Sequence, residues 1–172
     1  MKNNKGFSLI EVLITLVLTV IGILGMVAMQ TKAIQYTTDS VTRSSAVILT
    51  EDLLEVLRSN KDVIYNNKSE LKDDSKYFKA KGESFESLSC DTYSGFPSAE
   101  NPEEQLCVWV EYAKALLPGV TDNVLKDSYY IENDDNSVRI GVAWKVKSGE
   151  CVDSVKNDDG DDICSYSIVA EI

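Results

Sequence analysis

The feature that most constrains this chain is an apolar run close to its N-terminus. Residues 7–29 read FSLIEVLITLVLTVIGILGMVAM, 23 residues with a single charged side chain, that of Glu11. A helix of about 20 apolar residues is long enough to cross the hydrocarbon core of a bilayer. The run therefore predicts one membrane-spanning helix.

The charges on either side of this run predict its orientation. Lys2 and Lys5 precede it, whereas acidic residues prevail after Lys32. Because basic flanks stay on the cytoplasmic side, we expect a cytoplasmic N-terminus and an exported C-terminal part. A cleaved secretory signal is the alternative, but the run is too long for one and no A-x-A-like site follows it.

Glu11 is not explained by a plain single-span anchor. A carboxylate inside an apolar helix costs about 2.5–3.5 kcal/mol near the bilayer centre and less near an interface. An acidic residue within a membrane segment therefore marks a functional position whose partner has to be identified.

The segment GFSLIE at residues 6–11, with basic residues before it and an apolar helix after it, resembles the class III signal of type IV pilins and pseudopilins. The resemblance implies that a membrane-bound prepilin peptidase and methyltransferase cuts after Gly6 and methylates the new amino group of Phe7. It also implies that Glu11 contacts a Phe7 amine during filament assembly. Where water is excluded, a carboxylate and an ammonium each remove the other's unpaired cost.

This resemblance predicts three segments. Residues 1–6 form a leader that is removed, residues 7–30 form the transmembrane and assembly helix, and residues 31–172 form an exported globular head that includes the second half of a long helix. Loss of Lys2 and Lys5 with the leader takes the formal charge from −11 to −13. The acidic excess belongs to the head.

The helical pattern continues beyond the membrane segment. Apolar residues between positions 41 and 57 fall on one helical face, and Arg58-Ser59-Asn60 makes a plausible ending. A helix from residue 7 to about residue 59 would be roughly 80 Å long at 1.5 Å per residue. Gly22 and Gly25 are expected to permit close helix packing or local melting in a filament.

A polar stretch and a second helix are predicted next. Residues 61–96 are rich in Ser, Asp, Lys and Asn and predict a long connecting loop. Asn101 and Pro102 are typical of a helix start, and an apolar stripe over residues 106–117 then predicts a short helix that ends at Pro118-Gly119.

Strand patterns follow the second helix. Residues 128–132 and the alternating run at 138–147 predict a hairpin, and residues 166–172 predict a last strand. Three strands packed on one helix face make an α+β fold, a small antiparallel sheet on a long N-terminal helix, which is the pilin fold that the resemblance implies. The segment IGILG, the helix end LLE at 53–55, the run from Trp109 to Gly119 and the strand ending at Trp144 together resemble the PilV-type minor pilins.

All the cysteines lie beyond the membrane segment, so they are expected to form disulfides in an oxidising compartment rather than to bind a metal. They are Cys90, Cys107, Cys151 and Cys164. Three connectivities are possible, and we favour Cys90–Cys107 with Cys151–Cys164 because each pair closes a short loop.

Acidic residues at 157–162 raise the alternative of a calcium site. No alignment on Gly160 places acids as an EF-hand loop requires, so a solvated acidic turn is expected and no metal or cofactor is predicted. Asp134 and Asp135 are expected in a hairpin turn.

The composition excludes several functions. The chain has 28 Asp and Glu against 17 Lys and Arg, which argues against nucleic-acid binding. It has no histidine, so it lacks Ser-His and Cys-His nucleophile systems, and no two carboxylates are paired as a glycosidase requires. We expect no enzymatic activity.

The resemblance implies a minor subunit of a type IV pilus that primes or modifies assembly near the tip and supports twitching motility, adhesion or DNA uptake. Its expected partners are other minor and major pilins, the prepilin peptidase and an inner-membrane assembly platform. It would lie in the inner membrane with a periplasmic head before it enters the surface pilus. The alternatives are a minor pseudopilin of a type II secretion system and a pilus-borne adhesin.

Overall fold

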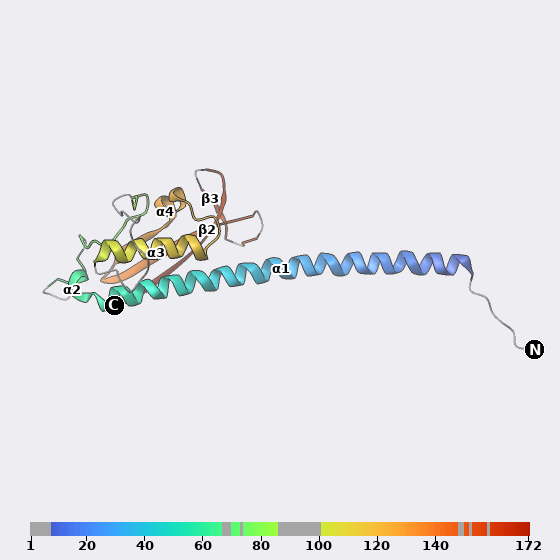
Figure 1. The fold of residues 1–172 in the computed structure, drawn as a ribbon, viewed down its shortest axis with the longest axis horizontal. Helices are drawn as coiled ribbons and strands as arrows, with labels where there is room; N and C mark the ends of the chain where they lie inside the picture. The colour runs from blue at the N-terminus through green and yellow to red at the C-terminus, as the bar shows by residue number, and fades with distance from the viewer. Residues whose placement is uncertain are drawn as a thin grey trace, which may run out of the picture. The chain divides into compact units, whose positions relative to one another are not determined.

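The computed structural model describes residues 8–66, 70–72, 74–85, 101–147, 150–151, 153–157 and 159–172. The chain divides into two compact units, residues 1–38 and 39–172. Its elements in chain order are α1 (Leu9–Ser59), α2 (Lys61–Ile64), α3 (Pro102–Leu116), α4 (Asp122–Ser128), β1 (Tyr130–Asp134), β2 (Ser137–Val146), β3 (Val155–Lys156) and β4 (Asp162–Ala170) (Figure 1). The predicted α+β class is confirmed, with a long apolar N-terminal helix followed by a small antiparallel sheet.

In the first unit, α1 is apolar and exposed on every side. Its most apolar 18-residue window has a mean hydropathy of 2.7, and no part of that window is buried. The Thr15 and Thr19 hydroxyls donate to main-chain carbonyls of the preceding turn, so they are satisfied without water. This helix is long and apolar enough to cross a membrane.

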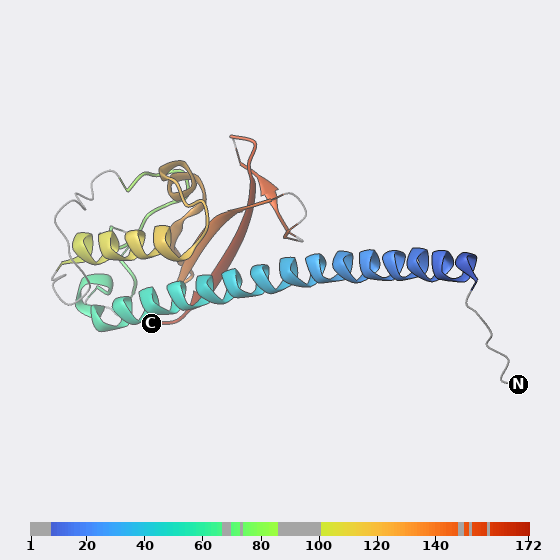
Figure 2. The same cartoon turned by 45° about the vertical axis from the view of Figure 1, so that its right-hand side comes forward.

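In the second unit, the remainder of α1 buries one stripe, as the predicted pattern requires. Its buried residues are Ala46, Leu49, Thr50, Leu53, Leu54 and Leu57. Helix α3 lies beside this part of α1 (Figures 1 and 2). The buried Trp109 of α3 donates its indole N–H to the Leu49 carbonyl at 2.8 Å, which fixes the two helices together.

The sheet is antiparallel, with strand order β1-β2-β4-β3. Strands β1 and β2 join through Asp135 and Asn136, whose φ angles of 49° and 68° are those of a two-residue type I′ hairpin turn. Asp134 was predicted in the turn but is the last residue of β1. Its carboxylate forms an ion pair with the Arg139 guanidinium. Val138, Ile140, Val142 and Trp144 are fully buried, as the predicted alternation requires. Gly141 and Ala143 between them are buried as well and Val146 is half-buried, so burial does not alternate at the centre of β2, where both faces of the strand are covered.

The predicted helix over residues 101–117 is also confirmed. The Asn101 side chain accepts a hydrogen bond from the Glu104 main-chain N–H at 3.0 Å, and Pro102 occupies the first turn. Acidic residues in that turn suit the positive end of the helix dipole.

Three details differ from the sequence expectations. The sheet has four strands rather than three. The additional strand, β3, was not predicted because two residues are too few to show an alternating pattern. Helix α4 was not predicted, since it offers only two buried apolar residues, Val124 and Leu125, after its capping residue Thr121. The stretch expected to be a loop contains α2 and is hydrogen-bonded to the sheet, because Lys79 and Ile131 exchange both main-chain hydrogen bonds at 2.9 Å.

Candidate functional site

Glu11 lies in the first turn of α1, exposed among apolar side chains. Its main-chain N–H donates to the Ser8 carbonyl at 3.0 Å, so the backbone is already helical at this position. The sequence contains no basic residue between Glu11 and Lys32. Gly6 and Phe7, the other predicted assembly residues, lie outside the described residues. The carboxylate is therefore presented on a helix surface that offers it no cation of its own.

A disulfide joins Cys151 to Cys164, with 6.3 Å between the Cα atoms. This is one of the two predicted pairs. Cys107 is disulfide-bonded as well, whereas its predicted partner Cys90 lies outside the described residues. The bond holds the loop after β2 to the start of β4, next to the edge strand.

This disulfide also contacts the second half of α1. Arg43 donates from Nη2 to the Cys151 Sγ at 3.3 Å and from Nε to the Asp39 carboxylate at 3.2 Å. The Asp39 carboxylate and both sulfur atoms lie within 4.8 Å of one another. Because the two sulfurs are bonded to each other, they offer no thiolate to a metal ion. Asp39, Arg43 and the disulfide therefore link the second half of α1 to the loop after β2.

The acidic turn predicted at residues 157–162 is engaged by side chains of the head. Asp161 forms an ion pair with Lys145 at 2.6 Å, and the hydrogen bond from Lys145 holds the pKa of the Asp161 carboxyl below its usual value. Asp159 accepts a hydrogen bond from Asn123 at 3.0 Å. Asp158 lies outside the described residues. The described acids of this turn therefore fasten it to β2 and α4.

Lys79 is a feature that sequence reasoning missed, because nothing in a polar stretch marks one lysine as buried. Only 5% of it is exposed. Its ammonium donates to the Tyr129 carbonyl at 2.6 Å and to the Lys126 carbonyl at 3.1 Å, and it lies 5.0 Å from the centre of the Phe85 ring. Burial lowers the pKa of Lys79 to about 8, against nearby carboxylates that raise it.

Comparison with known families gives two matches, which together cover the first half of the chain. Residues 1–27 match the prokaryotic N-terminal methylation motif, and residues 28–94 match the family described as type IV pilin Tt1218. The chain is a type IV pilin-like protein. No curated protein and no solved structure matches it.

For a type IV pilin-like protein, the motif implies processing by a prepilin peptidase and assembly with other pilins. Type IV pilins are structural subunits. The motif and the exposed apolar helix fit a pilin that is anchored in the inner membrane and later incorporated into the pilus. The predicted resemblance to type IV pilins is thus confirmed, whereas these matches do not select the PilV type.

Proposed function

We propose that this pilin-like protein is a minor subunit of a type IV pilus, of the PilV type, which primes or modifies assembly near the tip. The observation that carries the proposal is Glu11, a carboxylate on an apolar helix surface without a cation of its own. Residues 1–6 would be the leader, 7–30 the assembly helix in the inner membrane, and 31–172 the periplasmic head.

Assembly would proceed by transfer of the apolar half of α1 from lipid into a bundle of pilin helices. Removal of residues 1–6 creates an amino group at Phe7, and methylation keeps it basic. The Glu11 carboxylate of one subunit then pairs with the Phe7 amine of a neighbour. In a medium without water each charge is costly alone, so the pair selects the register in which both are matched.

One feature of the helix supports a minor rather than a bulk subunit. Many major pilins have a helix-breaking proline in this region, whereas this chain has none before Pro97. The presence of Glu11 supports a position beneath another subunit, because a tip-most subunit has no neighbour above to supply the amine. A minor pilin in this position would support twitching motility, adhesion or DNA uptake.

A minor pseudopilin of a type II secretion system uses the same signal segment and the same helix. Deletion of the gene distinguishes the two functions. Loss of surface pili with normal release of exoproteins supports the pilus subunit, whereas loss of exoprotein release with normal pili contradicts it.

The pairing mechanism is tested with Glu11→Ala and with Glu11→Gln, which keeps the shape and removes the charge. Exposed Glu51 on the same helix supplies the matched control, Glu51→Gln. We expect both Glu11 variants to enter sheared filaments about tenfold less or worse, as loss of a charge-assisted contact implies. Immunoblots of sheared filaments and membranes measure this.

Glu51→Gln should enter filaments as the wild type does, and all variants should reach the membrane in equal amounts. If Glu11→Ala is incorporated at the wild-type level, the carboxylate has no role in pairing and the proposed mechanism is wrong.

A further inference from the structure

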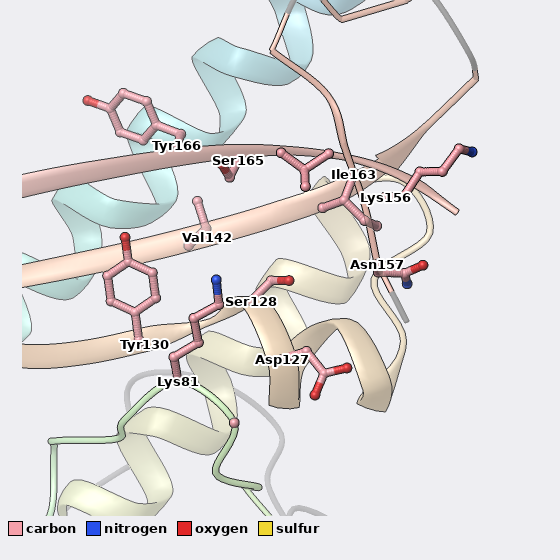
Figure 3. Close-up of a pocket in the computed structure, with 12 residues that line it drawn as sticks. Lys81, Asp127, Ser128, Tyr130, Val142, Lys156, Asn157, Ile163, Ser165 and Tyr166 are labelled. Atoms are coloured by element: carbon pink, nitrogen blue, oxygen red, sulfur yellow. The ribbon is translucent and has the colours of Figure 1, made fainter. Parts of the chain in front are cut away.

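A cavity of about 470 Å³ lies over the sheet of the head, beside the end of α4 (Figure 3). Strands β2 and β4 run beneath it, the segment at 81–82 and the end of α4 form one side, and β3 forms the other. Its volume is in the range of small-molecule pockets, about 300–1,000 Å³. Its residues lie between positions 81 and 166, so the assembly helix plays no part in it.

One side of the cavity is an aromatic ring held in place by a glycine. Tyr130 lies opposite Gly141 in the register of β1 and β2. A Cβ atom added at Gly141 would lie 2.2 Å from the Tyr130 ring, so any side chain at 141 would displace the ring. Glycine weakens the middle of a strand and marks a close approach of another group. Here it lets a half-exposed tyrosine ring rest against the backbone of the sheet.

A cation lies next to this ring. Figure 3 shows the Lys81 side chain extending over the sheet, with its ammonium between Tyr130 and Ser128. Within the described parts of the chain, no hydrogen bond or ion pair engages this ammonium. The second lysine of the cavity, Lys156, is engaged by the Gly160 carbonyl at 3.1 Å and by the Asp162 carboxylate at 3.4 Å. Lys81 is therefore the cation left to meet a ligand.

Neutral polar groups complete the cavity. Ser128 and Ser165 each present a hydroxyl. Asn157 accepts from the Asp161 N–H at 2.8 Å through its Oδ1, and its side chain also forms a hydrogen bond with the Asp161 carboxyl, which helps to lower the pKa of that group. Lys156 is balanced by Asp162, so the Lys81 ammonium and the Asp127 carboxylate are the remaining charges of the lining. A ligand carboxylate would therefore have the Lys81 ammonium as its partner, although the protein as a whole repels anions.

From these groups we infer that the cavity binds a carboxylate-bearing sugar, a uronic-acid unit of an anionic glycan. The Lys81 ammonium would pair with the carboxylate, and the apolar face of the pyranose ring would lie against Tyr130. The hydroxyls of Ser128 and Ser165 would bind sugar hydroxyls. A bare carboxylate would leave the ring and hydroxyls unused, and a neutral sugar would leave Lys81 unmatched. This inference goes beyond the assembly role and does not depend on it.

The test uses the full chain in detergent micelles and sodium D-glucuronate as the probe. D-glucose is the uncharged control, and sodium acetate is the carboxylate without a sugar ring. Saturation-transfer difference NMR is expected to give saturable glucuronate binding with a dissociation constant of about 1 mM, and both controls should bind about tenfold weaker or worse. Equal binding of acetate and glucuronate, or no saturable glucuronate binding, overturns the inference.

Three variants locate the site. Lys81→Gln should reduce glucuronate affinity to that of glucose, and Tyr130→Leu should weaken the binding of both sugars. Exposed Lys61, outside the cavity, supplies the matched control Lys61→Gln, which should bind glucuronate as the wild type does. Thermal unfolding of each variant checks the fold. If a folded Lys81→Gln binds glucuronate normally, the site is not this cavity. The assay requires no pilus, so its outcome is separate from that of the Glu11 test.

Discussion

The two parts of α1 have the same helical backbone but bury different amounts of apolar surface. Between Leu9 and Met29 the large apolar side chains are 47–84% exposed, whereas Leu49, Leu53 and Leu57 are at most 1% exposed. Burial of one such side chain stabilises by about 1.5–3 kcal/mol. The second part therefore gains its stability within the chain, while the first gains it only from lipid or from other helices.

This difference separates two properties that can be changed independently. Substitutions within residues 39–172 should alter folding of the head and leave membrane insertion intact. Substitutions in the apolar segment should do the reverse.

The largest expected effect on the head is that of Trp109→Ala. This residue is 1% exposed, its ring lies edge-on to Tyr129, and its N–H is bonded to α1. Loss of a buried tryptophan costs about 3–5 kcal/mol. Urea unfolding of the full chain in mild detergent measures this. Tyr112 on the same helix is 49% exposed, so Tyr112→Ala should cost about 1 kcal/mol or less. Equal costs would contradict the packing described.

The matched change in the apolar segment is Val17→Arg. Arginine at the centre of a membrane helix costs about 2.5–3.5 kcal/mol on insertion scales. We expect a marked fall in the membrane fraction that resists carbonate extraction, with an unchanged unfolding midpoint of the head. Val17→Ile is the control and should behave as the wild type does. Destabilisation of the head by Val17→Arg would show that the two regions are coupled.

Removal of the Cys151–Cys164 bond should act on the head alone. The two cysteines are 13 residues apart in sequence. In the chain-entropy model a disulfide that closes a loop of this size stabilises the folded protein by about 3 kcal/mol, which the variant would lose. The double variant Cys151→Ser with Cys164→Ser should lower the urea midpoint and leave carbonate-resistant membrane association unchanged. An unchanged midpoint would contradict a stabilising role of this bond.

The smallest expected effect is a pH dependence from Lys79. Its pKa is about 8 in the folded chain and 10.5 ordinarily, so between these values the unfolded chain binds more protons. Stability from this group should therefore rise as pH increases from about 8 towards 10, by about 1 kcal/mol or somewhat more. The unfolding free energy of the wild type minus that of Lys79→Met, measured across this pH range, isolates the contribution of Lys79. The contributions of the other titrating groups are the same in both proteins and cancel. A flat difference would contradict the assignment.

Local patterns predicted the long regular elements well. The helices at 9–59 and 102–116 and the hairpin around Asp135 follow from periodicity, a capping asparagine and turn residues, all of which act over a few positions. Helix α4 has seven residues and strand β3 has two, which is too few for such patterns. These elements are held mainly by neighbours that are distant in sequence.

The candidate sites show the same limit. Glu11 was identified from the sequence because a lone acid in an apolar run is costly wherever the chain folds. Lys79 and Lys81 stand two positions apart in one polar stretch, yet one is buried against carbonyls and the other extends into a cavity. Their roles depend on the positions of β1 and α4 relative to this stretch of chain.

By itself, the sequence determined the long apolar helix and the α+β class of the head, since hydrophobicity and periodicity act locally. Only the tertiary structure decided which lysine is buried, that the Cys151–Cys164 loop meets Arg43, and that Tyr130 rests on Gly141 beside a cavity. These depend on contacts between segments far apart in sequence, and no pattern along the chain records such contacts.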